Sequence, residues 1–105
     1  MAAGSVPVDR VYEDDRLFVI RDINPRAPTH VMLIPKDHIP SVQDLGAQHA
    51  SLLAHMLSTA TEVARELGLA DRGYRLTFNV GDEGGQTIYH LHLHLLGGRR
   101  LGPEG

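Results

Sequence analysis

The chain has 105 residues, enough for one compact domain with a single core and too few for two independent domains. Hydrophobic residues make up 42% of the chain and charged residues 22%, a globular balance that excludes a disordered protein. The net charge of -3 gives no field that would attract nucleic acid or an anionic membrane, and the absence of cysteine excludes disulfides, thiolate zinc sites and cysteine nucleophiles.

The N-terminal segment, residues 1–10, is expected to be poorly ordered because it consists largely of small residues and carries a proline. A single domain is expected over residues 11–105. The segment has neither the basic start nor the apolar run of a targeting signal, and no stretch approaches the roughly 20 apolar residues of a membrane span. We therefore expect a cytoplasmic protein that binds neither a membrane nor nucleic acid.

Two buried strands are predicted ahead of a helix. Residues 17–23 are rich in β-branched and aromatic side chains and are followed by two prolines. Residues 30–34 form a second apolar run, which Pro35 ends. Between residues 48 and 67 the apolar positions recur at helical spacing, and Gly68 stands where a left-handed residue would end the helix.

Two further strands are predicted after the helix. Residues 74–80 alternate apolar and polar side chains, as in a half-buried strand, and residues 81–85 form a glycine-rich loop. Residues 88–96 are the last strong strand. This order predicts an α+β domain in which an antiparallel sheet has one main helix packed on one face.

Three of the seven histidines alternate with leucine in the last predicted strand, as His90, His92 and His94. Successive side chains of a strand point to opposite faces, so the histidines share one face and the leucines form the core face. Neighbours on one face lie roughly 6.5 to 7 Å apart, so the three rings can surround one small anionic group. Histidine supplies both a nucleophile and a hydrogen-bond donor near neutral pH, which phosphorus chemistry requires.

Two other interpretations of the histidine row are open. A solvated face is one, although clustered histidines repel one another when protonated. A metal site is the other, because imidazole is a common ligand of zinc, copper and nickel. The preceding Gly-Gly-Gln-Thr of residues 84–87 offers backbone N–H groups, an amide and a hydroxyl, which suit phosphate oxygens better than a cation and favour an anion site.

Residues 84–99, Gly-Gly-Gln-Thr-Ile-Tyr-His-Leu-His-Leu-His-Leu-Leu-Gly-Gly-Arg, closely resemble the signature of the histidine-triad superfamily, His-φ-His-φ-His-φ-φ with φ apolar. The Gly-Gly-Arg ending is similar to that of its Hint branch. The likeness extends over residues 11–100 through Glu13-Asp14-Asp15, Ala27-Pro28-Thr29-His30 and Ile34-Pro35-Lys36. The resemblance implies an α+β homodimer whose two sheets join, and purine nucleotide binding.

The resemblance also implies hydrolysis of nucleoside 5′-phosphoramidates at the α-phosphate, with AMP or GMP as product. His92 would be the nucleophile that forms a nucleotidyl-histidine, and His94 would contact the α-phosphate and help to protonate the leaving group. His90 would orient the row, with His30 behind it. The implied nucleotide contacts are Asp22 and Ile23 for ribose and base, and Asn79, Gly85, Gln86 and Thr87 for the phosphate. Neither a metal nor another cofactor is implied.

The chemistry of these groups agrees with that assignment. Attack by His92 splits one difficult displacement into two easier steps, and the nearby donors stabilise the phosphoryl oxygens. The other ring nitrogen of His92 should then donate to a carbonyl that fixes the tautomer. His49 and His55 lie six residues apart on the predicted helix, so they form no metal pair and are expected to be solvated.

Three alternatives to this reading are open. Asp22 precedes Asn-Pro, where a carboxylate also commonly caps a turn. At the level of function, the alternatives are a nucleotide-binding or scaffold protein without catalysis and, less favoured, a metal-binding module.

Overall fold

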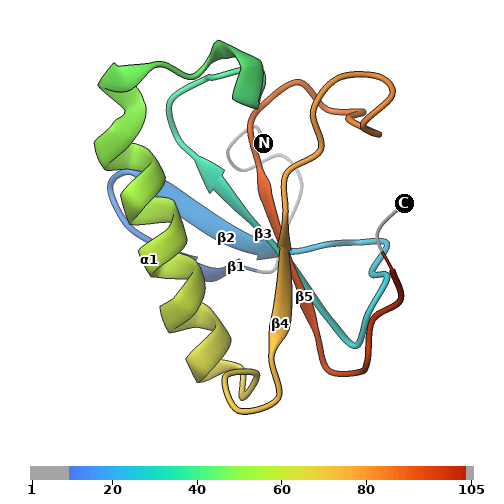
Figure 1. The fold of residues 1–105 in the computed structure, drawn as a ribbon. Coiled ribbons are helices and arrows are strands. Elements are labelled where there is room, and N and C mark those ends of the chain that lie inside the picture. The colour runs from blue at the N-terminus through green and yellow to red at the C-terminus, as the bar shows by residue number, and fades with distance from the viewer. Residues whose placement is uncertain (1–9, 104–105) are drawn as a thin grey trace.

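The computed structural model describes residues 10–103 as one sheet with one main helix (Figure 1). The strands are β1 (Arg10–Glu13), β2 (Leu17–Arg21), β3 (Thr29–Pro35), β4 (Tyr74–Thr77) and β5 (Leu93–Gly97), and the helix is α1 (Ala50–Glu66). Two short 3-10 turns, Val42–Asp44 and Ala47–His49, precede the helix. All strand pairs are antiparallel in the order β1-β2-β3-β5-β4. The predicted α+β fold is confirmed.

The main core lies between the helix and one face of the sheet. Alternate residues of β2, β3 and β5, such as Val19, Val31 and Leu93, point to this face and are almost completely buried. Helix α1 covers them with one apolar side, whose buried members are Leu52, Met56, Ala60, Val63 and Ala64. The leucines between the histidines also belong to this core, as the alternation predicts.

The opposite face of the sheet carries a second, smaller apolar cluster of Phe18, Ile20 and Ile34, with Met32 beside it. No helix of residues 10–103 covers this face (Figure 1). His30 and His94 lie on it as well, because they alternate with core residues of β3 and β5. The fold therefore presents two histidines beside an apolar floor on its open face.

The predicted last strand begins too early. β5 starts at Leu93 and not at residue 88, so His90 and His92 precede the strand. The N–H of Leu91 donates to the carbonyl of Ile39, at 2.6 Å, which draws this segment toward the chain after β3 and away from the regular ladder. The prediction that all three histidines lie on one regular strand is therefore wrong. Leu91, Leu93 and Leu95 nevertheless point into the core.

Other element ends also differ from the predictions. β2 ends at Arg21, two residues early, because Asp22 caps the N–H of Asn24 and starts a turn. β4 ends at Thr77 and not at residue 80, and β1 was not predicted as a strand. Helix α1 is shorter than the predicted 48–67, and Gly68 follows it with the expected positive φ of 78°.

Two further expectations concern the N-terminal segment and membrane-spanning helices. The segment 1–10, predicted to be poorly ordered, lies outside the described residues except for Arg10, where β1 begins. Within residues 10–103, no helix combines the length and the apolar character needed to cross a membrane.

Candidate active site

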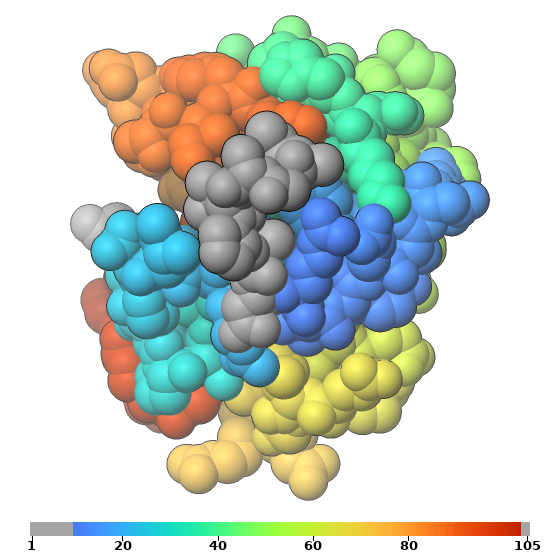
Figure 2. Space-filling model, turned by 180° about the vertical axis from the view of Figure 1, so that it is seen from behind, coloured from blue at the N-terminus to red at the C-terminus, as the bar shows by residue number. Residues whose placement is uncertain are grey.

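A cavity of about 910 Å³ opens on the face of the sheet that the helix leaves uncovered. Figure 2 shows the segment after β2 and the loop before β5 on two sides of this recess. Its lining includes seven of the ten predicted site residues, namely Asp22, Ile23, Asn79, Gly85, Thr87, His92 and His94. The volume lies within the range of small-molecule sites, and Ile20 and Met32 form an apolar floor.

His92 is held in one tautomer at the edge of this cavity. Its Nδ1 lies 2.8 Å from the backbone carbonyl of His90. A carbonyl oxygen only accepts hydrogen bonds, so Nδ1 carries the hydrogen and Nε2 of the neutral ring keeps its lone pair. The contact with a backbone carbonyl is the one that the sequence predicts for a histidine nucleophile.

His94 and His30 form a directed hydrogen-bond chain. The N–H of Arg26 donates to Nδ1 of His30, at 3.2 Å, so the hydrogen of a neutral His30 is on Nε2. That Nε2 lies 2.9 Å from Nδ1 of His94 and donates to it. The hydrogen of a neutral His94 is therefore on Nε2, which makes this ring a donor. His94 lines the cavity, and its ring centroid lies 4.9 Å from that of His92.

Burial lowers the pKa of both members of this pair. It lowers the pKa of His94 to about 4, helped by the charges of His92, His30 and Arg26, while Asp22 acts in the opposite direction. Burial likewise lowers the pKa of His30 against the opposing charge of Asp22. Both rings are therefore neutral at pH 7 in the free protein, as the hydrogen-bond chain requires.

His90 lies behind the cavity and does not line it. Its Nε2 donates to the carbonyl of Pro35 at 2.8 Å, and its Nδ1 lies 3.3 Å from Nδ1 of His38. The side chain thus ties the segment before β5 to the end of β3, and the backbone carbonyl receives His92. This arrangement gives His38, for which the sequence suggests no role, a structural contact with the site.

Asp22 caps a turn and also lines the cavity. Its Oδ1 caps the turn by accepting the N–H of Asn24 at 2.8 Å, and its Oδ2 lies 3.4 Å from Nε2 of His30. The residue also lines the cavity beside Ile23, which is 91% exposed. A turn cap and a cavity carboxylate are therefore compatible in one side chain.

Gln86 is placed differently from the other predicted phosphate contacts. It is buried and does not line the cavity. Its amide nitrogen donates to the carbonyls of Pro40 and Ile88, and its oxygen accepts the N–H of Gly81. The side chain thus fixes the loop from beneath. Gly85 and Thr87 on either side of it do line the cavity, Gly85 with a φ of +84° that favours glycine.

The groups that could hold a metal ion differ from the predicted row. Within the described part of the chain, only Asp22, His30 and His94 bring three ligand atoms within 4.8 Å of one another. The 2.9 Å between the two ring nitrogens is a hydrogen-bond distance. Two nitrogens around a tetrahedral zinc ion would lie roughly 3.3 Å apart, given Zn–N bonds of about 2.0–2.1 Å. This geometry fits a shared proton better than a shared ion.

Several residues that line the cavity are not among those predicted from the sequence. Ile20 and Met32 belong to predicted strands, and strand alternation places them on the face opposite the core, which was a usable signal. Arg26 lines the cavity from the turn after β2 and carried no sequence signal of its own.

Two histidines that do not line this cavity also differ from the prediction. His55 and His49 were expected to be solvated. His55 pairs with Asp14 at 2.7 Å, and Nδ1 of His49 accepts the N–H of Gly46 at 2.9 Å.

The antiparallel sheet with one covering helix and the histidine site fit the histidine-triad resemblance of the sequence. Comparison with known proteins agrees with this class. The sequence matches the HIT domain family over residues 3–101, and the chain belongs to that family. It is 49% identical to the purine nucleoside phosphoramidase of Escherichia coli (strain K12), over 93% of this chain and 82% of that protein. The chain is thus a phosphoramidase-like member of the family, as the sequence predicts.

Solved structures of the family have the same fold. A HIT family hydrolase from Legionella pneumophila is 48% identical, with a TM-score of 0.89 over 90% of this chain and 85% of that chain. A histidine triad protein from Clostridium difficile is 36% identical, with a TM-score of 0.91 over 95% of this chain and 87% of that chain.

Proposed function

We propose that this chain hydrolyses purine nucleoside 5′-phosphoramidates, releasing an amine and a nucleoside monophosphate of the AMP or GMP type. The observation that carries the proposal is the fixed tautomer of His92, whose Nδ1 donates to the carbonyl of His90 at 2.8 Å. This contact leaves Nε2 as an unprotonated nucleophile at a cavity large enough for a nucleotide. The 49% identity to a purine nucleoside phosphoramidase supports the same substrate class.

In the first step, Nε2 of His92 attacks phosphorus and the P–N bond to the amine breaks. The amine leaves with the electron pair of that bond and takes up a proton, and the nucleotide is joined to His92. In the second step, water attacks phosphorus, the bond to His92 breaks, and the nucleoside monophosphate is released with a neutral ring left behind. Overall, one water replaces one amine.

His94 is suited to assist at the phosphate. In the free site its Nε2 carries the hydrogen and donates, because its Nδ1 accepts from His30. An anionic α-phosphate near this ring would raise its pKa from the low value that burial produces. A proton taken up in this way can pass to the departing amine. Asn79, Gly85 and Thr87 line the same cavity and would contact the phosphate oxygens.

Asp22 and Ile23 would bind the sugar and the base. The Oδ2 of Asp22 suits a ribose hydroxyl, since its other oxygen already caps a turn. Ile23 is exposed at the rim, and the apolar floor formed by Ile20 and Met32 suits a flat purine. Gln86 and His90 would act without touching the nucleotide. Gln86 holds the loop by accepting the N–H of Gly81, and the backbone carbonyl of His90 holds the ring of His92. The cytoplasmic location stays a prediction.

The decisive experiment compares the protein with its His92→Ala variant on adenosine 5′-phosphoramidate. We expect the variant to lose at least about 1000-fold in kcat while still binding AMP, because the nucleophile is removed and the cavity is kept. Thr61→Ala, on the exposed side of α1, is the control and should keep full activity. Equal turnover by the wild type and the His92 variant would refute the mechanism.

Two results would favour the alternative functions. Calorimetric binding of AMP without any turnover by the wild type would favour a nucleotide-binding or scaffold protein. Stoichiometric metal in the purified protein, with loss of activity in the presence of a chelator, would favour a metal-binding module.

A further inference from the structure

The peptide unit between His90 and Leu91 is hydrogen-bonded at both of its polar groups. Its carbonyl accepts the Nδ1 hydrogen of His92 at 2.8 Å, and its N–H donates to the carbonyl of Ile39 at 2.6 Å. The N–H and C=O of a trans peptide lie in one plane and point in opposite directions. The contact with Ile39, whose side chain is buried in the main core, therefore helps to fix the carbonyl that receives His92.

The ring of His90 is also held at both nitrogens. Its Nε2 lies 2.8 Å from the carbonyl of Pro35, which only accepts, so Nε2 carries the hydrogen and Nδ1 of the neutral ring has a lone pair. Nδ1 of His38 lies 3.3 Å from that nitrogen, and the two rings meet edge to face with their centroids 5.0 Å apart. His38 is therefore the donor, with its hydrogen on Nδ1.

These contacts belong to a set of hydrogen bonds that joins residues 35–40 to residues 86–91. The members of the set are His90 with Pro35, His38 with His90, Leu91 with Ile39 and Gln86 with Pro40. His38 is the only residue of 35–40 that contributes a side chain to this set, since the others contribute backbone carbonyls. His38 does not line the active-site cavity, so its contact with His90 can be removed without changing the cavity wall.

We propose that His38 is a positioning residue for the nucleophile. By donating to His90, it holds the ring and the adjoining carbonyl that keeps the hydrogen on Nδ1 of His92. Without this donor, the carbonyl of His90 is less firmly placed and His92 also populates the tautomer with its hydrogen on Nε2. In that tautomer the attacking nitrogen has no lone pair. The proposal rests on the proposed function and adds a residue to its mechanism.

The test compares His38→Asn with His38→Leu, two side chains of nearly the same shape. The amide nitrogen of asparagine, like Nδ1 of histidine, is bonded to Cγ and can donate to His90, whereas leucine cannot donate. On adenosine 5′-phosphoramidate, we expect His38→Leu to lower kcat about tenfold and His38→Asn to stay within about twofold of the wild type. Asp37→Ala, at the exposed neighbour, is the control and should keep the wild-type kcat.

Binding of AMP separates positioning from general damage to the site. The dissociation constant, measured by calorimetry, should stay close to the wild-type value in His38→Leu, because His38 does not line the cavity. A loss of AMP affinity as large as the loss of kcat would overturn the proposal, and so would an equal kcat in the asparagine and leucine variants.

Nitrogen-15 NMR of the histidine rings tests the proposal independently of turnover. In the wild type, the hydrogen should be on Nδ1 of His92 and on Nε2 of His90. In His38→Leu, His92 should become a mixture of both tautomers, while His38→Asn should keep the wild-type pattern. This result would support the role of His38 even if the wild type did not cleave the phosphoramidate, which would refute only the proposed function. An unchanged tautomer of His92 in His38→Leu would overturn the positioning role, whatever the activity shows.

Discussion

In the free protein, the two buried histidines of the site, His30 and His94, are more stable as neutral rings than as charged ones. The N–H of Arg26 occupies Nδ1 of His30, and the hydrogen on Nε2 of His30 is directed to Nδ1 of His94. A proton added to His94 at Nδ1 would displace that donor, and the new charge would lie on a side chain that is only 6% exposed. This local structure, together with burial, explains why the pKa of His94 falls to about 4.

The stability of the protein should therefore depend on pH between about 6.5 and 4. Because the folded pKa of His94 lies below that of a free histidine, the unfolded chain takes up the proton first as the pH falls. The stabilisation is fully present above pH 6.5 and is lost as the pH falls toward 4. We expect the free energy of unfolding to fall by on the order of 2 kcal/mol over this range, measured by urea denaturation.

The His94→Gln variant tests the cause of this pH dependence. It should be less stable than the wild type at pH 7.5, because its side chain fits the His30 contact less well, and its stability should fall less steeply toward pH 4.5. An identical slope in the variant and the wild type would show that the dependence comes from other groups.

At the residue scale, much of the site can be predicted from the sequence, because alternation and the neighbouring glycines bring His92, His94 and Gly85 to one place. The exceptions are Gln86 and His90, whose side chains point away from the cavity. Gln86 donates to the backbone carbonyls of Pro40 and Ile88, and His90 donates to that of Pro35. The direction of a loop side chain depends on which carbonyls lie beneath the loop. That information is tertiary, and no local pattern contains it.

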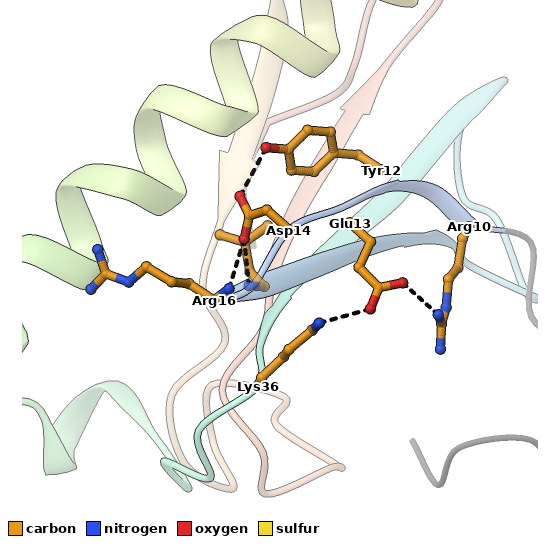
Figure 3. Close-up of polar contacts among 7 residues, drawn as sticks. Arg10, Tyr12, Glu13, Asp14, Arg16 and Lys36 are labelled. Atoms are coloured by element: carbon orange, nitrogen blue, oxygen red, sulfur yellow. Dashed lines mark hydrogen bonds and ion pairs between the residues drawn. The ribbon is translucent and has the colours of Figure 1, made fainter.

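At the scale of elements, the turn between β1 and β2 is held by one carboxylate (Figure 3). Oδ1 of Asp14 accepts the N–H groups of Arg16 and Leu17, at 2.8 and 2.9 Å. Its Oδ2 accepts the hydroxyl of Tyr12 and pairs with Nε2 of His55 on α1, at 2.8 and 2.7 Å. Partial burial raises the pKa of Asp14, but these hydrogen bonds outweigh it and hold the pKa well below its usual range.

Asp14→Ala should destabilise the protein by about 1–3 kcal/mol, because it removes the acceptor for two turn N–H groups and the tie between the sheet and α1. Asp14→Asn should cost less, since its amide oxygen can still accept the N–H groups of Arg16 and Leu17. Urea denaturation at pH 7 measures both changes.

Asp15→Ala is the matched control for this turn, since Asp15 is the exposed neighbour of Asp14. It should change the stability by less than about 0.5 kcal/mol. A loss in Asp15→Ala as large as that in Asp14→Ala would contradict the role of Asp14.

The centres of the elements were easier to predict than their ends. Apolar runs and helical spacing identify β2, β3 and α1, because burial on one or both faces determines those patterns. β1 was missed because it has only four residues and none is buried. The start of β5 was misplaced because leucine and histidine continue to alternate through residues 90–92, where the backbone already bonds to Ile39.

At the scale of the whole molecule, the sheet separates packing from binding. One face is covered by α1 and supplies most of the core, while the other carries the cavity and its histidines (Figure 1). The sheet has two edges, β1 and β4. β1 carries Arg10 and Glu13, which pair with each other, and charged side chains of this kind protect an edge from strand addition. β4 has half-buried residues throughout.

We propose that two copies of the chain join along β4 to form the homodimer that the family resemblance implies. Pairing there would satisfy the outward backbone groups of β4 and continue the antiparallel sheet. Light scattering should then give twice the chain mass of 11.5 kDa. In hydrogen exchange, amides on the outer edge of β4 should be protected, while those of β1 provide an internal control and exchange faster. A monomer mass, or a dimer that protects β1 and leaves β4 open, would contradict this arrangement.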